Sequence, residues 1–457
     1  MAYTFALETL GCRLNQAESA VFARQFIGRG YRLVEDSADA DLCIINTCTL
    51  THQATSKCRR LIRSIIRRNP DVCVAAVGCY SQVGVEELQT IPGLDYIIGT
   101  ADKMRLPEII PTPAKRKEPL VVKQRAARER FTIDSTGYYP LHTRANLKIQ
   151  EGCDFVCSYC IVPKSRGPAR SRDFEDISRE ARALVSDGHR ELIITGVNVG
   201  TYNDQDRTLV DVVDALEAID GLERVRLSSI EPTTIDDGII DRMTRDGKLS
   251  PYLHVPLQSG DDGVLERMRR KYTSTEFVEF IDFARSRIPD LGLGTDVIVG
   301  FPGEDEEAFE RTCRLVEEIP FTNVHVFSFS ARERTGAHGL PDQIPGEVIA
   351  ERSKKFHKIA HTKKSEFYNG QKNRLLQILF EERDDEGRWV GFSGNYVKVG
   401  VEGSRDLSNR MGIVRVKGIA NPSETDHKRL VASGDLLEVE ETAIPLVARE
   451  ASLDQAS

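Results

Sequence analysis

The sequence predicts an α/β protein in three parts: an N-terminal parallel-sheet domain, a six-stranded parallel partial barrel of the (β/α)6 type, and a small C-terminal antiparallel β-barrel. Strand-like apolar runs alternate with helix-period stretches through residues 1–110, and six more strand–helix units follow before residue 340. Such alternation is typical of parallel sheets covered by helices. From residue 372 the pattern changes to short alternating runs with glycine-rich turns, which favours a small antiparallel barrel.

The composition places the chain among globular proteins with several domains. It has 457 residues, of which 40% are hydrophobic and 29% charged, so we expect two or three domains. The expected boundaries are 1–110, a basic linker at 111–138, the barrel with a closing helix at 139–370, the small barrel at 371–442 and a tail at 443–457. Ten cysteines without a signal peptide or a membrane-length apolar run indicate a reducing, cytoplasmic setting and metal sites rather than disulfides.

Net charge does not indicate a nucleic-acid binder. The chain carries a formal charge of −8, so any RNA contact must come from local basic surface. Two stretches supply such surface, a predicted helix within 57–68 and the linker segment 114–130. Taken alone, each is more simply interpreted as an ordinary solvated charged face.

Three cysteines of the N-terminal domain follow predicted strands. Strands are expected at 3–10, 41–45, 72–77 and 96–98, with helices at 17–29 and 53–68. Cys12, Cys48 and Cys79 come directly after the first three strands. Because the carboxyl ends of parallel strands share one sheet edge, these thiols should converge there. A three-thiolate iron–sulfur site is therefore physically reasonable, whereas Cys43, Cys58, Cys73 and Cys313 are expected to be ordinary buried residues.

Another cysteine triad, Cys153-x3-Cys157-x2-Cys160, follows the first predicted barrel strand. No fourth cysteine or histidine lies nearby in sequence, whereas a structural zinc site usually has four protein ligands. Three thiolates can instead hold a 4Fe–4S cluster and leave one iron open. The alternative is three unrelated cysteines, which the position of the triad, between a strand and a helix, disfavours. The barrel strands are expected at 145–150, 191–195, 225–229, 252–256, 294–299 and 323–328.

The Cys-x3-Cys-x2-Cys spacing resembles that of the radical S-adenosylmethionine (SAM) superfamily. Together with Cys12, Cys48 and Cys79, it makes nearly the whole chain resemble the radical SAM methylthiotransferases. The resemblance implies two 4Fe–4S clusters and two molecules of SAM per turnover, one methylating a cluster-held sulfur and one supplying a radical. It implies no catalytic side chain beyond the cluster cysteines. The polar or glycine positions at strand ends that it implies for SAM binding are Gly196, Asn198, Ser228, Glu231, Gln258, Asp296 and Gly300.

Within that family, the stretch from Gly11 to Glu18 looks most like the branch that modifies N6-threonylcarbamoyladenosine in tRNA, beside the anticodon. Two alternatives share the chemistry and act on isopentenyladenosine in tRNA or on a ribosomal-protein aspartate. A different class would be a non-catalytic RNA-binding metalloprotein. The missing fourth ligand beside the 153–160 triad disfavours that class.

The resemblance also implies partners and substrate contacts. It implies tRNA and an external electron donor such as flavodoxin or ferredoxin, no membrane, and a monomer. Arg332 stands where the family pattern has an arginine, although the surrounding segment departs from that pattern. Its guanidinium could pair with the threonyl carboxylate of the substrate, or Arg332 could be an ordinary surface residue. The C-terminal strands resemble a TRAM domain, an RNA-binding module, and the phosphate contacts suggested there are Lys398, Arg415 and Lys417.

Overall fold

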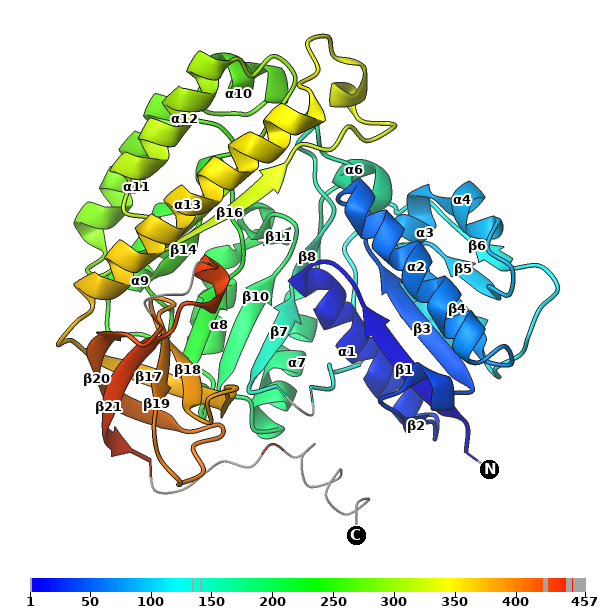
Figure 1. Cartoon of the computed structure of the whole chain (residues 1–457). Helices are drawn as coiled ribbons and strands as arrows, with labels where there is room; N and C mark the ends of the chain where they lie inside the picture. The colour runs from blue at the N-terminus through cyan, green and yellow to red at the C-terminus, as the bar shows by residue number, and fades with distance from the viewer. Residues whose placement is uncertain (1, 134, 140–141, 422–425, 441–445, 447–457) are drawn as a thin grey trace.

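The computed structural model of the chain describes every residue except 1, 134, 140–141, 422–425, 441–445 and 447–457 (Figure 1). Almost all of the expected tail therefore lies outside the described residues. The expected α/β architecture is confirmed, with a parallel N-terminal sheet, a half-open parallel barrel and a closed five-stranded barrel. Within the part that the structure describes, no helix combines the length and apolarity needed to cross a membrane.

The N-terminal sheet has six parallel strands in the order β2-β1-β3-β4-β5-β6. Its central strands are fully buried apolar runs, as expected for a parallel sheet covered on both faces. β6 lies in the segment expected as a linker, so the sheet extends further along the chain than the apolar runs indicated. The strands are β1 (Thr4–Thr9), β2 (Arg32–Leu33), β3 (Leu42–Thr47), β4 (Cys73–Gly78), β5 (Tyr96–Ile98) and β6 (Leu120–Val122).

Helices cover both faces of this sheet. One face packs its apolar side chains against α2 and the other against α1, which makes two separate cores. Thr51 caps α2 by accepting a hydrogen bond from the backbone N–H of Ala54. The helices are α1 (Arg13–Ile27), α2 (His52–Arg68), α3 (Cys79–Val83), α4 (Val85–Gln89), η2 (Lys103–Arg105) and α5 (Leu106–Ile109).

The partial barrel consists of two three-stranded parallel sheets, β7-β10-β13 and β14-β15-β16. The ladder expected between its third and fourth strands is interrupted. Only local contacts join the halves there, such as the hydrogen bond from the N–H of Ile230 to the carbonyl of His254 (3.0 Å). The main strands are β7 (Arg144–Lys148), β10 (Glu191–Thr195), β13 (Arg224–Leu227), β14 (Tyr252–His254), β15 (Gly292–Val299) and β16 (Asn323–Ser328). Short strands are β8 (Gln150–Glu151), β9 (Arg170–Ser171), β11 (Asn203–Asp204) and β12 (Arg207–Thr208).

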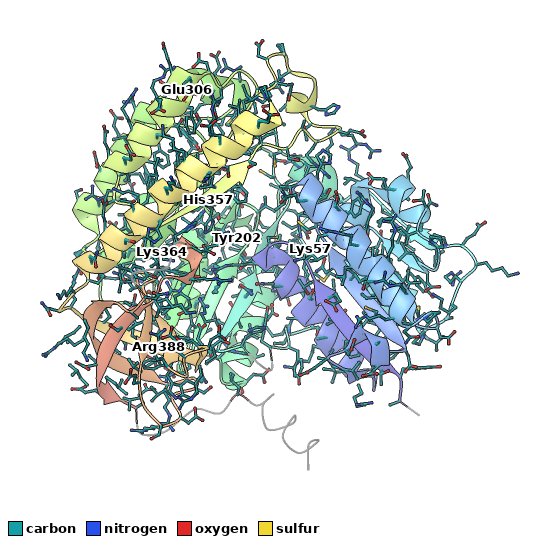
Figure 2. All side chains as sticks on the ribbon, in the orientation of Figure 1. Lys57, Tyr202, Glu306, His357, Lys364 and Arg388 are labelled. Atoms are coloured by element: carbon teal, nitrogen blue, oxygen red, sulfur yellow. The ribbon has the colours of Figure 1, made fainter. Side chains whose placement is uncertain are left out.

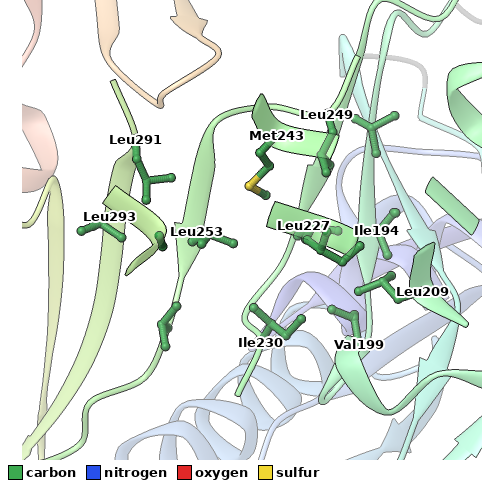
Figure 3. Close-up of a cluster of buried hydrophobic side chains, with 14 of the residues drawn as sticks. Ile194, Val199, Leu209, Leu227, Ile230, Met243, Leu249, Leu253, Leu291 and Leu293 are labelled. Carbon is green, nitrogen blue, oxygen red and sulfur yellow. The ribbon is translucent and has the colours of Figure 1, made fainter. Parts of the chain in front are cut away.

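The largest core of the molecule lies between these strands and their outer helices. Figure 3 shows part of it, with Leu227, Met243 and Leu253 converging from different elements. Side chains at alternating strand positions enter this core, and the positions between them face the barrel interior. The helices are α6 (Val162–Ser165), α7 (Phe174–Ser186), α8 (Leu209–Glu217), α9 (Asp237–Thr244), α10 (Asp262–Met268), α11 (Ser274–Arg287), α12 (Glu306–Glu318) and α13 (Gly346–Gly370).

The C-terminal strands close into a barrel in the order β17-β18-β19-β21-β20. Four of its five pairs are antiparallel, but β19 and β21 run parallel, which the sequence pattern did not indicate. α13 runs beside β16 toward this barrel (Figure 1). The strands are β17 (Leu375–Arg383), β18 (Trp389–Ser393), β19 (Lys398–Val401), β20 (Met411–Ile419) and β21 (Ala432–Val439).

Tyr396, between β18 and β19, joins all three parts. Its hydroxyl accepts hydrogen bonds from Arg13, next to Cys12, and from Arg144 of β7 (3.3 Å to the latter). Its ring stacks under the guanidinium of Arg226 and against Tyr252. Burial alone would raise the pKa of Tyr396, but the three guanidinium groups outweigh it and lower the pKa to about 8.

Candidate functional site

The 153–160 triad lies on the loop between β8 and α6, at the carboxyl end of the first barrel strand. All three cysteines are partly exposed. The loop folds back on itself, because the N–H of Cys153 donates to the carbonyl of Gly167 (3.2 Å) and that of Cys160 to the carbonyl of Cys157 (3.1 Å). Gly152 has φ +73°, and a Cβ there would lie 1.9 Å from the carbonyl oxygen of Pro168. Only glycine permits this entry to the loop.

The second triad forms at the edge of the N-terminal sheet. Cys12 precedes α1, Cys48 follows β3, and Cys79 opens α3 directly after β4. The thiols are close together, because Cys12 and Cys79 both contribute to the raised pKa of Cys48, and Cys12 contributes to that of Cys79, in each case after burial. Gly11, with φ +105°, faces Cys48, and a Cβ there would lie 2.9 Å from the Cys48 sulfur. A side chain at position 11 would therefore fill the space that the thiols share.

Neither triad has the close spacing of thiolates that share a single zinc ion. Thiolates on one zinc ion lie roughly 3.8 Å apart, because each Zn–S bond is about 2.3 Å. Among the described residues, neither cysteine triad brings three sulfurs within 4.8 Å of one another. An iron–sulfur cluster binds each thiolate through a different iron atom and so suits this wider spacing.

Burial raises the pKa of most of these thiols. It raises the pKa of Cys48 and of Cys160 to about 12 and that of Cys153 to about 11. Burial also raises the pKa of Cys79, against the opposing charges of Arg166 and Lys103. Since thiolates are the ligand form, loading a cluster must release protons from both triads. The other cysteines, Cys43, Cys58, Cys73 and Cys313, are buried as expected.

Buried polar atoms without partners lie where the sequence suggested SAM contacts. The amide nitrogen of Asn198 and the hydroxyl of Ser228 have no hydrogen-bond partner among the described residues. The Asn198 oxygen accepts from the Thr234 hydroxyl (3.1 Å) and, at 3.5 Å, from the N–H of Glu231. Buried polar groups are rarely left unpaired in proteins. These buried polar atoms, on the loops beside the 153–160 triad, therefore suit a polar ligand such as the amino-acid end of SAM.

The other suggested SAM positions divide into two groups. Gly196 packs against Gln150, and the N–H of Gln258 donates to the carbonyl of Asp296 (2.8 Å), with Gln258 at a φ of +66°. These positions face the barrel interior. Gly300 instead meets Ile349 of α13, where a Cβ would lie 2.4 Å from that side chain. The glycine at 300 thus serves helix packing.

Arg270, for which the sequence predicted no role, connects the 153–160 triad to Glu231. Its Nη1 lies 3.3 Å from the sulfur of Cys157 and 3.2 Å from the Tyr159 hydroxyl, and its Nη2 pairs with Glu231. Burial raises the pKa of Glu231, and Arg270 opposes this. The position follows α10 in a run of three basic residues, and nothing in that run distinguishes Arg270 from its neighbours.

A buried ion network joins the two triads. Glu18 of α1 and Glu151 of β8 share three cations, Lys103, Lys148 and Arg166, at distances of 2.6–3.0 Å. All five side chains are at most 3% exposed. The network holds the N-terminal sheet against the barrel, since Glu18 and Lys103 come from one part and the others from the next.

Arg332 lies beside the second triad. Its Nη2 donates to the Thr49 hydroxyl (2.6 Å), next to Cys48, and its Nη1 contacts His52 (3.2 Å). The Nε atom is buried without a partner among the described residues. Arg332 thus links the end of β16 to the start of α2.

The suggested RNA contacts on the C-terminal barrel differ in their surroundings. Arg415 is exposed and Lys417 pairs with Asp435 (2.6 Å). Lys398 is half-buried near Lys364 of α13, whose pKa falls to about 8, chiefly through burial and then through the charge of Lys398. Figure 2 labels Lys364 and His357 on α13, and the ring of His357 lies 5.7 Å from that of His427. Two lysines therefore lie close together where α13 meets this barrel.

Two parts of the chain match known protein families. Residues 147–316 match the Radical SAM superfamily, and residues 4–99 match the family described as Uncharacterized protein family UPF0004. Threonylcarbamoyladenosine tRNA methylthiotransferase MtaB of Bacillus subtilis is 36% identical over 91% of this chain and 93% of that protein. The Chlamydia pneumoniae protein of that name is 38% identical, covering 78% of this chain and 82% of its own. The tRNA-2-methylthio-N(6)-dimethylallyladenosine synthase of Bacillus cereus is 32% identical over 95% and 86%.

Solved structures agree with the fold. The radical S-adenosylmethionine methyltransferase TsrM of Kitasatospora setae superimposes with a TM-score of 0.51 over 71% of this chain and 73% of its own. The sequence identity is 14%, so this likeness concerns the fold alone.

Proposed function

We propose that this chain, which belongs to the radical SAM methylthiotransferase family, adds a methylthio group to carbon 2 of N6-threonylcarbamoyladenosine beside the anticodon of tRNA. Support comes from the relatives, because those named for threonylcarbamoyladenosine are 34–38% identical and those named for dimethylallyladenosine 32–33%. The residues from Gly11 to Glu18 favour the same branch.

The cofactor assignments follow the two triads. Cys153, Cys157 and Cys160 would hold the 4Fe–4S cluster that binds SAM, and Cys12, Cys48 and Cys79 would hold a second one. When bound, the first cluster with SAM supplies a radical able to open the unactivated C–H bond at carbon 2 of adenine. A turnover would use two SAM molecules, with electrons from an external donor such as flavodoxin or ferredoxin.

The side chains of the protein would hold the reactants in position and exclude water from them. Asn198, Ser228 and Glu231 would bind the polar end of SAM, and Arg270 would fix Glu231 and the Cys157 sulfur relative to each other. The buried network around Glu18 and Glu151 would keep the distance between the triads constant. Such fixed geometry is what a reaction without a nucleophilic side chain requires.

Contacts to tRNA would come from local basic surface. The C-terminal barrel offers Lys398 and Arg415, and α2 offers exposed residues such as Lys57 (Figure 2). Lys417 would contribute less, because Asp435 already pairs with it. Arg332, through its unpartnered Nε, would be one contact to the substrate nucleoside.

The proposal rests on one observation: the chain has two separate cysteine triads, and a buried ion network joins the two parts that carry them. Mass spectrometry of tRNA nucleosides from cells with and without the gene tests it. Loss of only 2-methylthio-threonylcarbamoyladenosine is expected. Loss of the isopentenyl analogue instead would keep the chemistry and overturn the substrate, and loss of neither would overturn the tRNA assignment.

A further inference from the structure

Two imidazoles and a carboxylate meet on the inner face of the second half-barrel. Asp296 of β15 accepts from Nε2 of His254 (2.9 Å) and from Nδ1 of His325 (3.2 Å), and the two rings lie 5.0 Å apart. In the register of the sheet, Asp296 is directly opposite His325. Leu253, Val297 and Val324, the neighbours in sequence, enter the outer core. The three polar side chains therefore point the other way, into the barrel interior.

The three residues differ in exposure, and the difference suggests their roles. The side chain of His254 is 8% exposed and that of Asp296 20%, whereas that of His325 is 48% exposed. His254 thus supports Asp296 from within the wall, and Asp296 orients His325. Asp296 holds the Nδ1 atom of His325, and among the described residues the Nε2 atom of His325 has no partner. His325 therefore presents Nε2 to the interior, where an anionic ligand would receive a hydrogen bond from it.

The surroundings of His325 suit a nucleoside. Phe327, two residues further along β16 on the same face, is 43% exposed although it is large and apolar. Beyond the strand, Arg332 contacts Thr49 beside Cys48. On the opposite side, Asp296 is close enough to Glu231 to influence its pKa. The inner face of β16 thus lies between Glu231, which Arg270 joins to the 153–160 triad, and Arg332, which lies beside the second triad.

We propose that His325, held by Asp296 and His254, recognises the anionic threonylcarbamoyl group on N6 of the substrate adenosine, with Phe327 against the base. This inference rests on the proposed function and names a specificity-determining residue for it. The terminal nitrogens of Arg332 are already engaged by Thr49 and His52, so His325 offers the freer donor. An isopentenyl group cannot accept a hydrogen bond and would leave this donor unpaired, which gives a physical basis for rejecting it.

The same three groups could also be close enough to share a divalent cation. The hydrogen bonds argue against this, because the Asp296 carboxylate already satisfies one nitrogen of each ring. Metal analysis of the holoenzyme decides the point, since a bound ion other than iron would disappear in the His325→Ala protein.

The test compares holoenzymes on one tRNA carrying either threonylcarbamoyl or isopentenyl at N6. For His325→Ala we expect kcat/KM on the threonylcarbamoyl substrate to fall roughly 10- to 100-fold, the loss of one charge-assisted hydrogen bond. The preference over the isopentenyl substrate should fall by the same factor. His325→Gln, which keeps a donor, should recover part of both. Formation of 5′-deoxyadenosine without tRNA should stay unchanged, as should every activity of the control His338→Ala, which alters an exposed histidine.

Binding of a threonylcarbamoylated anticodon stem-loop gives a second readout, and the His325→Ala protein should bind it more weakly while binding the unmodified stem-loop equally. Unchanged discrimination, an equal loss of SAM cleavage without tRNA, or a stoichiometric divalent ion at this position would each overturn the inference. A wild-type enzyme inactive on the threonylcarbamoyl substrate would instead overturn the proposed function, and the inference with it.

Discussion

Arg270 donates from Nη1 to the sulfur of Cys157 across 3.3 Å, while its Nη2 pairs with Glu231. One side chain thus touches both a thiol of the first triad and a candidate SAM contact. The two residues it joins are far apart in sequence, on the β8–α6 loop and after β13. Their relative position depends on this guanidinium.

We expect Arg270→Lys to lower SAM cleavage by about 100-fold or more, because a lysine cannot reach both partners in the same geometry. The yield of 5′-deoxyadenosine under anaerobic reduction measures this. Arg269→Ala is the matched control, since its side chain is exposed and comes just before Arg270. Equal activity of the two variants would show that Arg270 has no positioning role.

Replacement of an N-terminal cysteine should separate the two halves of the chemistry. In Cys48→Ala we expect loss of about four iron atoms per chain and of methylthio transfer, while SAM cleavage at the other triad continues. Cys58→Ala is the control, because this buried thiol lies against the backbone of Cys48 and belongs to neither triad. Iron content and both products are measured on the same preparation. Methylthiolated product from Cys48→Ala would contradict the assignment of the second cluster.

Tyr396 should make stability depend on pH in the alkaline range. Its pKa in the folded protein is about 8, below the usual value of about 10 in an unfolded chain. The ionised phenol therefore stabilises the fold fully above about pH 10, and this contribution disappears as the pH falls through 8. The difference is up to about 3 kcal/mol. Urea unfolding at pH 7 and pH 9.5 should show a larger cost of Tyr396→Phe at the higher pH, and a pH-independent cost would contradict the shift.

The buried network should be far more costly to break than a surface pair across the same joint. Arg166→Ala leaves Glu18 and Glu151 with fewer cations in a fully buried site, and we expect about 3–5 kcal/mol of destabilisation. Arg24→Ala breaks the half-exposed pair with Asp187, which also joins α1 to the barrel, and should cost about 1 kcal/mol or less. Denaturant unfolding of both variants checks this. Similar costs would mean that the network is not essential to the joint.

Strongly apolar segments of the fold could be predicted well from the sequence. The strand at Glu191–Thr195 is a continuous buried run, and its predicted limits are those of β10. The limits of β5 and β16 were predicted equally well. β5 and β10 are recognisable because burial on both faces demands a largely apolar run. β16 instead alternates apolar and polar residues and is buried mainly on one face, which gives the period-two pattern of a strand.

Features that depend on distant partners could not be predicted. β6 has only three residues and is a strand because β5 pairs with it. The gap between β13 and β14 and the parallel pair β19–β21 arise from how whole sheets curve and close. Arg270 belongs to the site through contacts 39 to 113 residues away, and no local pattern records such contacts. The site residues taken from the resemblance stay predictions until variants test them.

The place of Tyr396 changes what a domain deletion would mean for this protein. The loop that carries Tyr396 belongs to the C-terminal barrel. It nevertheless packs against Tyr252 of the partial barrel and accepts a hydrogen bond from Arg13, the residue next to Cys12. Removing residues beyond 371 would uncover Arg144 and Arg226 and free the start of α1. A truncated chain that lost activity would therefore say little about RNA binding, because the deletion would also disturb the surroundings of Cys12, a proposed cluster ligand. The C-terminal barrel looks like a separate domain in the sequence, but in the folded protein it supports the other two parts. Single substitutions on its outer surface are therefore a better test of its role than its deletion.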